Sequence, residues 1–535
     1  ARLACGLVPG MRAATPSDEP TPLRDLSCGA AAGGSGDAAP AWSPCAALSS
    51  EPGLGRSLLS RYFGAMGTGS QRSSVLSLAS TAFGSALLVT PSVFASLGLL
   101  LGMAVLAFTG LATLLSLRLL ANGAYATGRD TYGEVVAASL GSKAAFAADV
   151  VLSLYGFFVA CSCFIFLKQL VPALARNVGL PPWLVSSDLW LLAAIAAFLA
   201  PLCLARTLAA LRYAALLAVG SLVVSVLAMC VETPAKHAEL VDRMARGAGG
   251  TADPLPADFW WWPAAGSSAV AAVPLDLAIC VFAVTCHVSI FPIQHELTLP
   301  VARRVDKVLV RAMALVTLIY GLVGIMCFIS LGPPCKEEVP TEPWPSCTPR
   351  NVLASPRFHD PVGTLAQAAM AVTVMVSIVF NLAAGRRALL GLLGCGPRPA
   401  ARLPGAATTG TELDGGPAAQ DPPEPPASGD TSRWHTPVTL LLLLVATGVG
   451  VAFDSIAAIM AVLGGFCVAS FGFAIPMAMT VALRPRIAAR WPDSRIGEWL
   501  GVTPRGTVAA GLVMTITCGV CYASVVQAVA SSVSG

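Results

Sequence analysis

Charged residues are scarce in this chain of 535 residues. Asp, Glu, Lys and Arg together make up 12% of it, whereas soluble domains carry about 25%. Hydrophobic residues make up 55%, which is more apolar surface than a soluble core could bury. The net charge is only +4 and the basic residues are scattered, so the concentrated basic surface of a nucleic-acid-binding protein is excluded. The composition predicts an integral membrane protein surrounded by lipid.

Signatures of catalysis are missing as well. The sequence has no HExxH motif, no nucleophile elbow and no paired carboxylates inside its apolar runs. Five histidines and sixteen cysteines are present, and most of the cysteines stand singly in apolar runs, where they are small hydrophobes more often than metal ligands. We therefore predict a protein that is not an enzyme and holds no cofactor. Nothing in the sequence points to an obligate protein partner.

Long apolar windows recur along the chain instead. A helix needs about 20 apolar residues to cross a bilayer core, and lipid offers backbone groups no other partners, so each window is expected to be a helix. We predict an all-α membrane protein with eleven transmembrane helices, a short Gly-containing turn separating the first two. The windows are residues 73–96, 99–121, 144–170, 189–204, 209–231, 273–293, 308–331, 362–384, 438–453, 456–483 and 508–529.

Basic residues indicate how the helices are oriented. Lys and Arg concentrate in cytoplasmic loops, and here they follow every even-numbered window. This alternation predicts an odd number of crossings, a cytoplasmic N-terminus and an external C-terminus. The five clusters are Arg118, Arg129 and Lys143; Arg206 and Arg212; Arg303, Arg304, Lys307 and Arg311; Arg386, Arg387, Arg398 and Arg402; and Arg484, Arg486, Arg490 and Arg495.

Polar segments between the windows mark the boundaries of the predicted domains. Residues 1–72 are rich in Ala, Gly, Pro and Ser and are predicted to be a disordered cytoplasmic tail. Residues 232–272 form a polar external loop in this topology. Residues 396–433, rich in Pro, Gly and Asp, are predicted to be a flexible cytoplasmic loop. Residues 484–535 comprise a cytoplasmic loop, the last helix and the C-terminus.

A second external segment, between the seventh and eighth windows, contains Cys335 and Cys347. If this face meets an oxidising compartment, the two residues are expected to form a disulfide. If it meets a reducing space, they stay two free thiols.

Helix-breaking residues interrupt the first and the sixth windows. The first contains GSALLVTP, from Gly84 to Pro91, and the sixth contains TCHVSIFP, from Thr285 to Pro292. Taken alone, either segment is explained by the bends and close packing that Gly and Pro bring to membrane helices. His287 alone is more often an interhelical hydrogen-bonding residue than a ligand or proton carrier. The two together, each at the head of a block of five helices, favour a functional interpretation.

The two blocks, residues 73–231 and 273–483, each contain five windows, so they must have opposite orientations in the membrane. This pattern is typical of secondary transporters built from inverted repeats, with the eleventh helix peripheral. Backbone groups freed at a break must line a cavity. The amide end of a half-helix binds a carboxylate, and freed carbonyls with nearby hydroxyls suit a cation. An α-amino acid carries the matching carboxylate and ammonium.

The two broken windows also resemble a known family. Residues 77–94, SLASTAFGSALLVTPSVF, are similar to the opening motif N-x-x-N-x-x-x-G-S-G-I-L-x-x-P of the amino acid/auxin permease family. Residues 282–297, FAVTCHVSIFPIQHEL, resemble its motif F-x-C-H-x-x-x-L-P-I-Y-x-E-L. The family includes sodium-coupled neutral and vacuolar amino acid transporters. The resemblance implies a LeuT-like 5+5 inverted repeat that transports amino acids, chiefly neutral ones, by symport with Na⁺ or H⁺.

Carried over by position, the resemblance implies a set of site residues. Both motif asparagines are serines here, which removes amide oxygens that suit Na⁺ and leaves H⁺ coupling open. One motif glycine is Ala86, so the unwound segment is expected to be tighter. The substrate-binding residues would be Gly84, Ser85, Ala86, Cys286, His287 and Ser289, and the ion-binding residues would be Ser77, Ser80 and Thr373.

Two functional hypotheses follow. The first is secondary active transport of amino acids by alternating access. The second is a membrane sensor or receptor that binds an amino acid with little transport, recruiting partners through the tail or the 396–433 loop. Flux through purified protein distinguishes them.

Overall fold

The computed structural model describes residues 71–129, 131–205, 212–245, 260–261, 269–297, 302–335, 347–393, 434–490 and 504–534. All of them belong to one compact unit, residues 66–535. Within the described residues the secondary structure is helical apart from a single isolated bridge between Pro334 and Thr348. The all-α prediction is therefore confirmed. The predicted cytoplasmic loop 396–433 and all but the last two residues of the predicted 1–72 tail lie outside the described residues.

The α-helices are long and mostly apolar. Nine of the described helices are long and apolar enough to cross a membrane, and α6 is a shorter apolar helix. The helices are α2 (Gln71–Ala82), α3 (Ala86–Thr127), α4 (Tyr132–Leu140), α5 (Ser142–Val178), α6 (Asp188–Cys203), α7 (Arg212–Ala245), α8 (Ala269–Ala283), α9 (Ile290–Glu296), α10 (Ala302–Leu331), α11 (Pro361–Leu392), α12 (His435–Ala452), α13 (Ile456–Met460), α14 (Ile475–Arg490) and α16 (Pro504–Ser534). Three 3₁₀ segments, η1 (Pro182–Val185), η4 (His287–Ser289) and η5 (Val352–Ala354), and a π-helix, η6 (Ala461–Ala474), complete the list.

Every predicted window coincides with helical segments, and the first, sixth and tenth windows each extend over more than one of them. The end of the first window and the whole of the second share α3, which is two helices joined at Gly98, whose φ of 73° and ψ of 171° are not helical. A positive φ is readily adopted only by glycine, so this is the Gly-containing turn that the sequence predicts.

Two helical segments were not predicted. Helix α4 begins after Thr131, whose side chain accepts a hydrogen bond from the Glu134 amide, an N-terminal capping arrangement. Helix α7 continues to Ala245, so residues 232–245 of the predicted external loop are helical. The extension is stabilised because Lys236 Nζ donates to Arg357 O and the Arg357 guanidinium donates to Lys236 O.

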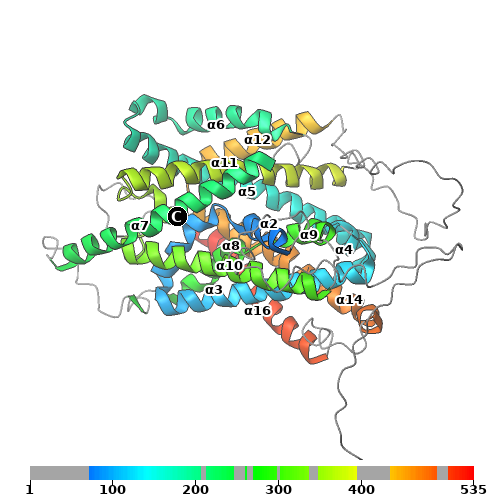
Figure 1. Ribbon diagram of the computed structural model, residues 1–535. Helices are drawn as coiled ribbons and strands as arrows, with labels where there is room; N and C mark the ends of the chain where they lie inside the picture. The colour runs from blue at the N-terminus through cyan, green and yellow to red at the C-terminus, as the bar shows by residue number, and fades with distance from the viewer. Residues whose placement is uncertain are drawn as a thin grey trace, which may run out of the picture. The chain divides into compact units, whose positions relative to one another are not determined.

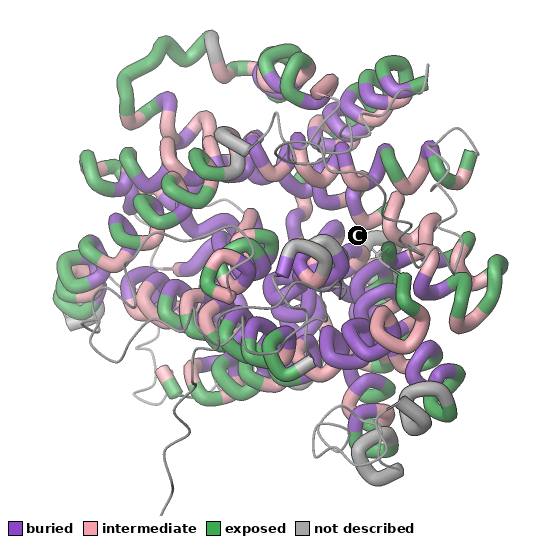
Figure 2. The backbone as a smooth tube through the Cα atoms, turned by 45° about the vertical axis from the view of Figure 1, so that its right-hand side comes forward, coloured by how far each residue is buried: buried purple, intermediate pink, exposed green. Residues whose placement is uncertain are grey.

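The long helices lie side by side, with α8 among them (Figure 1). Helix α5 packs against α11, α3 packs against α10, and α7 packs against both α10 and α11. Helices α6 and α12 pair at one edge of the bundle, while α16 lies at the opposite edge against η6 and α8. Figure 2 shows buried residues gathered along the inner faces. Large apolar side chains such as Phe198, Leu216 and Leu444 are exposed, as expected of surfaces that face lipid.

Glycines permit the closest helix contacts. A Cβ on Gly156 of α5 would lie 2.7 Å from Asn381 O and 2.8 Å from Gly385 N of α11. Gly464 of η6 lies directly against the carbonyl group of Ala278 in α8. Small residues let helix backbones approach one another in a membrane, and these two contacts position α11 and α8 around the site described next.

Candidate functional site

The first predicted break is present in the structure. Helix α2 ends at Ala82 and α3 begins at Ala86, leaving Phe83, Gly84 and Ser85 between them. The hydroxyl of Tyr320 in α10 donates to Ala82 O at 2.8 Å, which satisfies a carbonyl that the break frees. Ser85 is the N-cap of α3 but its side chain does not cap the helix. Within this first turn the Leu87 amide donates to Gly84 O at 3.1 Å and the Leu88 amide donates to Ser85 O at 3.0 Å. The N-terminal end of α3 still carries the partial positive charge of the helix dipole.

The second break lies in the sixth window. Helix α8 ends at Ala283 and η4 begins at His287, with residues 284–286 between them. Thr285 Oγ1 donates back to Val281 O at 2.6 Å. Cys286 Sγ lies 3.8 Å from Met313 Sδ of α10 and is buried. Both windows are thus interrupted near the segments that the sequence singled out.

Polar groups of α5 and α11 surround the start of α3. A Cβ on Gly84 would lie 3.9 Å from Ser377 Oγ, and Ser85 Oγ lies 4.0 Å from Cys163 Sγ. Asn381 Nδ2 donates to Ser377 O at 2.9 Å. Ser377 and Asn381 were not predicted as site residues. The signal that could have found them is a pair of polar residues one helical turn apart in an otherwise apolar run.

Ala86 is buried, and its carbonyl accepts a hydrogen bond from Thr90 Oγ1 at 2.9 Å. Its side chain therefore packs at the first turn of α3, beside the groups just described.

His287 lies against the π-helix η6 and not beside the first break. Its ring is buried between Phe471 and Phe473 of η6, with ring centroids 6.0 Å and 5.6 Å away. Both ring nitrogens are buried with no hydrogen-bond partner, so no hydrogen bond joins His287 to Ser85. Ser289, at the other end of η4, is half-buried. The structure thus places His287 against η6 and not against the start of α3.

The predicted ion-binding residues are dispersed. Ser77 is exposed, and Ser80 Oγ donates to Ser77 O within the same helix at 2.8 Å. Thr373 Oγ1 lies 3.2 Å from Ala218 O of α7 and from Ala369 O of its own helix. Ser377 lies one turn beyond Thr373 on α11, and its hydroxyl is the one that lies beside Gly84 in the first break.

A π-helix lies beside the second break. Residues Ala461–Ala474 form η6, and π-helical turns are frequent at functional sites. Hydroxyl groups of α4 and α3 donate to its carbonyls: Tyr132 OH to Phe471 O at 2.6 Å, and Ser116 Oγ to Gly472 O. The ring of Tyr155 lies 5.0 Å from that of Phe471. Hydropathy alone gave no signal for this irregular helix.

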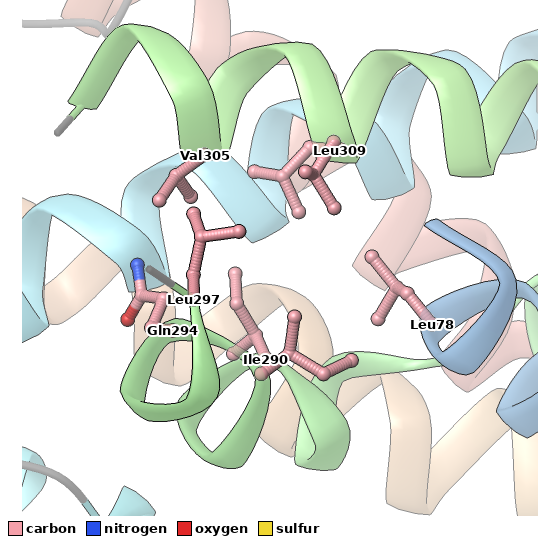
Figure 3. Close-up of a pocket in the computed structure, with 8 residues that line it drawn as sticks. Leu78, Ile290, Gln294, Leu297, Val305 and Leu309 are labelled. Carbon is pink, nitrogen blue, oxygen red and sulfur yellow. The ribbon is translucent and has the colours of Figure 1, made fainter. Parts of the chain in front are cut away.

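A small hollow lies between α2, α9 and α10, away from the polar groups at the first break. Figure 3 shows its side chains pointing toward one another from the three helices. Among the described residues that line the hollow, Gln294 is the one polar side chain and none is charged. It is lined by Leu78, Ile290, Ile293, Gln294, Leu297, Val305, Val308 and Leu309.

A disulfide joins Cys335 to Cys347 in the structure, which corresponds to the first of the two alternatives for this pair. Thr348 Oγ1 donates to Gly332 O at 2.6 Å, so the segment after the disulfide is held against the end of α10.

Membrane-length helices, two of them interrupted beside buried polar groups, define a multi-pass membrane protein of the transporter class. The family model "Transmembrane amino acid transporter protein" matches residues 67–501, and the chain belongs to this family. The resemblance seen in the two broken windows is therefore confirmed. The family is one of transporters and not of enzymes.

Two curated relatives match about half of the chain. A Toxoplasma gondii protein classed as an amino acid transporter is 28% identical over 278 residues, which are 52% of this chain and 36% of that protein. The vacuolar amino acid transporter 6 of Saccharomyces cerevisiae is 26% identical over 263 residues, which are 49% of this chain and 56% of that protein. The chain thus spans about a third and about half of the lengths of these relatives.

Solved transporter structures align over most of the chain. An Eremococcus coleocola manganese transporter aligns with 85% of this chain and 94% of its own, at 11% identity and a TM-score of 0.40. A Na⁺-coupled sialic acid symporter aligns with 84% and 97%, at 14% identity and a TM-score of 0.36.

Proposed function

We propose that this protein carries amino acids, chiefly neutral ones, across a membrane by alternating access. The observation that carries the proposal is the paired interruption at residues 83–85 and 284–286. The N-terminal end of α3, which no side chain caps, offers the partial positive charge of the helix dipole to a substrate carboxylate. Freed carbonyls and the Ser377 hydroxyl offer oxygens to an ammonium group or a coupling cation.

The proposed topology is a 5+5 inverted repeat plus one peripheral helix. Each block begins with a broken helix, α2 with the first part of α3 in one case and α8 with α9 in the other. Counting the two parts of α3 separately and including α6 gives eleven crossings. Helix α6 has 16 residues and is about 24 Å long, which requires local thinning of the bilayer. The N-terminus is proposed to be cytoplasmic, in the plasma membrane or a vacuolar or lysosomal membrane.

The coupling ion is proposed to be H⁺ or Na⁺, bound near the first break. Gly84, Ser85, Ala86, Cys286, His287 and Ser289 remain the proposed substrate residues, and Ser77, Ser80 and Thr373 remain the proposed ion residues. Ser377 joins this second set because it reaches the break.

The test is counterflow by the purified full chain in liposomes. Each amino acid is supplied at two pH values, with and without Na⁺. The proposal expects saturable exchange of a neutral amino acid that depends on pH or on Na⁺. Saturable binding without flux in any condition would overturn it and favour the sensor.

A further inference from the structure

The side of the molecule that carries the Cys335–Cys347 disulfide, called here the disulfide face, holds a second junction between the two broken helices. Ser92 lies on α3, and Asp276 lies on α8. Each is about two helical turns, or roughly 10 Å, from the break in its own helix. This junction is therefore separate from the breaks themselves.

One guanidinium connects both helices at this junction. Arg350 Nη1 lies 3.4 Å from Asp276 Oδ1 of α8 and 3.1 Å from Ser92 Oγ of α3. Ser96 Oγ, also on α3, donates to the other carboxylate oxygen of Asp276. Asp276 is 0% exposed. A buried carboxylate without a partner is strongly unfavourable, so the packed arrangement of α3 against α8 depends on Arg350.

Arg350 belongs to neither helix but to the segment that the disulfide anchors. Cys347 is bonded to Cys335, and the Cys335 amide donates to Thr348 O at 3.1 Å. Beyond Arg350, Asn351 Nδ2 lies 3.4 Å from Phe166 O of α5. The short segment that contains Arg350 is thus held on both sides of the arginine, by the disulfide at Cys347 and by the contact of Asn351 with α5.

The other face is closed by different chemistry. There α2 packs against α9 around the hollow of Figure 3, and the described residues that line it, among them Leu78, Ile290 and Leu297, carry no charge. The contact between the two broken helices is thus charged at the disulfide face, whereas at the other face the described residues between α2 and α9 are apolar. An ion pair on that second face, Arg118 with Asp306, joins α3 to α10 and not the two broken helices.

We propose that Asp276 and Arg350 are the gating pair of the disulfide face, with Ser92 and Ser96 as positioning residues. The inference rests on the proposed function, because a gate requires a solute path. While the pair is intact, α3 and α8 stay together and cover the breaks. When the helices separate, water replaces Arg350 at the Asp276 carboxylate.

The test measures access to the breaks and not flux. Cys163 and Cys286 are buried beside the first and second breaks, so they are native reporters. The purified full chain is treated with the charged thiol reagent MTSET, and modification of each cysteine is followed by peptide mass spectrometry. In Asp276→Asn and Arg350→Gln variants, both reporters are expected to react about tenfold faster. The double variant is expected to react no faster than the singles, because one interaction is lost.

Matched controls separate gating from general loosening. Asp454→Asn removes a different ion pair, in which Lys168 Nζ lies 2.5 Å from Asp454 Oδ1, and is expected to leave the reporters unchanged. Cys203 and Cys327, also buried, should react at the parent rate in every variant. If Asp276→Asn fails to fold, Ser96→Ala removes one hydrogen bond to the carboxylate and is expected to give a smaller increase in the same two reporters.

Reporter rates within twofold of the parent in folded variants would overturn the gate, as would an equal rise at Cys203 and Cys327. If the reporters react faster in the variants but the parent protein transports no amino acid, the proposed transport is overturned and the pair is a closure over the two breaks without a transported amino acid. Flux in the parent with unchanged reporters would overturn the gate alone.

Discussion

A single hydroxyl makes the first helix break compatible with a membrane interior. Tyr320 is fully buried, its OH donates to Ala82 O, and its ring stacks on Phe83 at 6.0 Å. A carbonyl left without a partner in such a place is costly. Tyr320 therefore stabilises the first break by a hydrogen bond, although it lies far from the break in sequence.

Replacing Tyr320 by Phe is expected to lower the free energy of unfolding by about 1–3 kcal/mol, since Ala82 O then has no donor. Thermal unfolding in detergent measures the change. Tyr522→Phe is the matched control, because the Tyr522 hydroxyl meets Ser470 Oγ at 3.0 Å at an exposed position. Equal effects of the two substitutions would contradict the role given to Tyr320.

Gly84 lies in the first break, where the space around it admits a larger side chain. Its added Cβ meets nothing nearer than 3.9 Å, so Gly84→Val is expected to fold and reach the membrane normally. The new side chain would occupy the space opposite Ser377 that we assign to substrate, so uptake should be lost. Gly448, where a Cβ meets nothing within 4 Å, gives the control Gly448→Ala. Normal uptake by a well-expressed Gly84→Val protein would argue against a site at this break.

At the scale of elements, the sequence predicted the helices well and their irregular parts unevenly. The windows and both breaks were predictable because hydropathy, glycine and proline are local signals. Helix α4 was not, because its nine residues are too few for the apolar window of a membrane crossing. The extension of α7 and the π-helix η6 were not, since each depends on partners elsewhere in the chain. Lys236 needs Arg357, and the carbonyls of η6 need Tyr132 and Ser116. The position of His287 against η6 could not be predicted for the same reason.

Helices α5 and α11 approach each other closely at Gly156, which leaves no room there for a side chain. Gly156→Ala places a Cβ against the α11 backbone, so it is expected to destabilise the protein by about 1–3 kcal/mol through overpacking. Gly448→Ala in α12 brings the same gain in helix propensity without a clash. The difference between their melting temperatures isolates the packing cost. A Gly156→Ala protein as stable as Gly448→Ala would show that the two helices can move apart freely.

At the scale of the whole molecule, the basic residues predict how the helices are oriented in the membrane, whereas the packing shows which helices lie at the edge of the bundle. The packing of α16 at the edge, against η6 and α8, agrees with a peripheral eleventh helix. The assignment of the cytoplasmic face comes from the basic residues in the loops. The site itself was predictable only as two segments, since Ser377 and Asn381 are brought to the break by tertiary packing.

An odd number of crossings predicts that the two chain ends lie on opposite sides of the membrane. Epitope tags at the two ends of the full chain should differ in accessibility to antibody before permeabilisation, with the N-terminal tag protected. Permeabilised cells, in which both tags should be stained, are the control. Tags accessible from the same side would require an even number of crossings and a different arrangement of the two blocks.

The unlike closures at the two faces have a consequence for how the surrounding medium acts on the protein. Hydrophobic contacts weaken on cooling, which affects the closure around Leu78. Dissolved salt screens charges that are partly solvated, which affects the Asp276–Arg350 pair, because Arg350 is 25% exposed. In the proposed transport cycle, cold weakens the closure at one face and dissolved salt weakens the closure at the other. We therefore expect temperature and salinity to shift the side to which the empty protein opens.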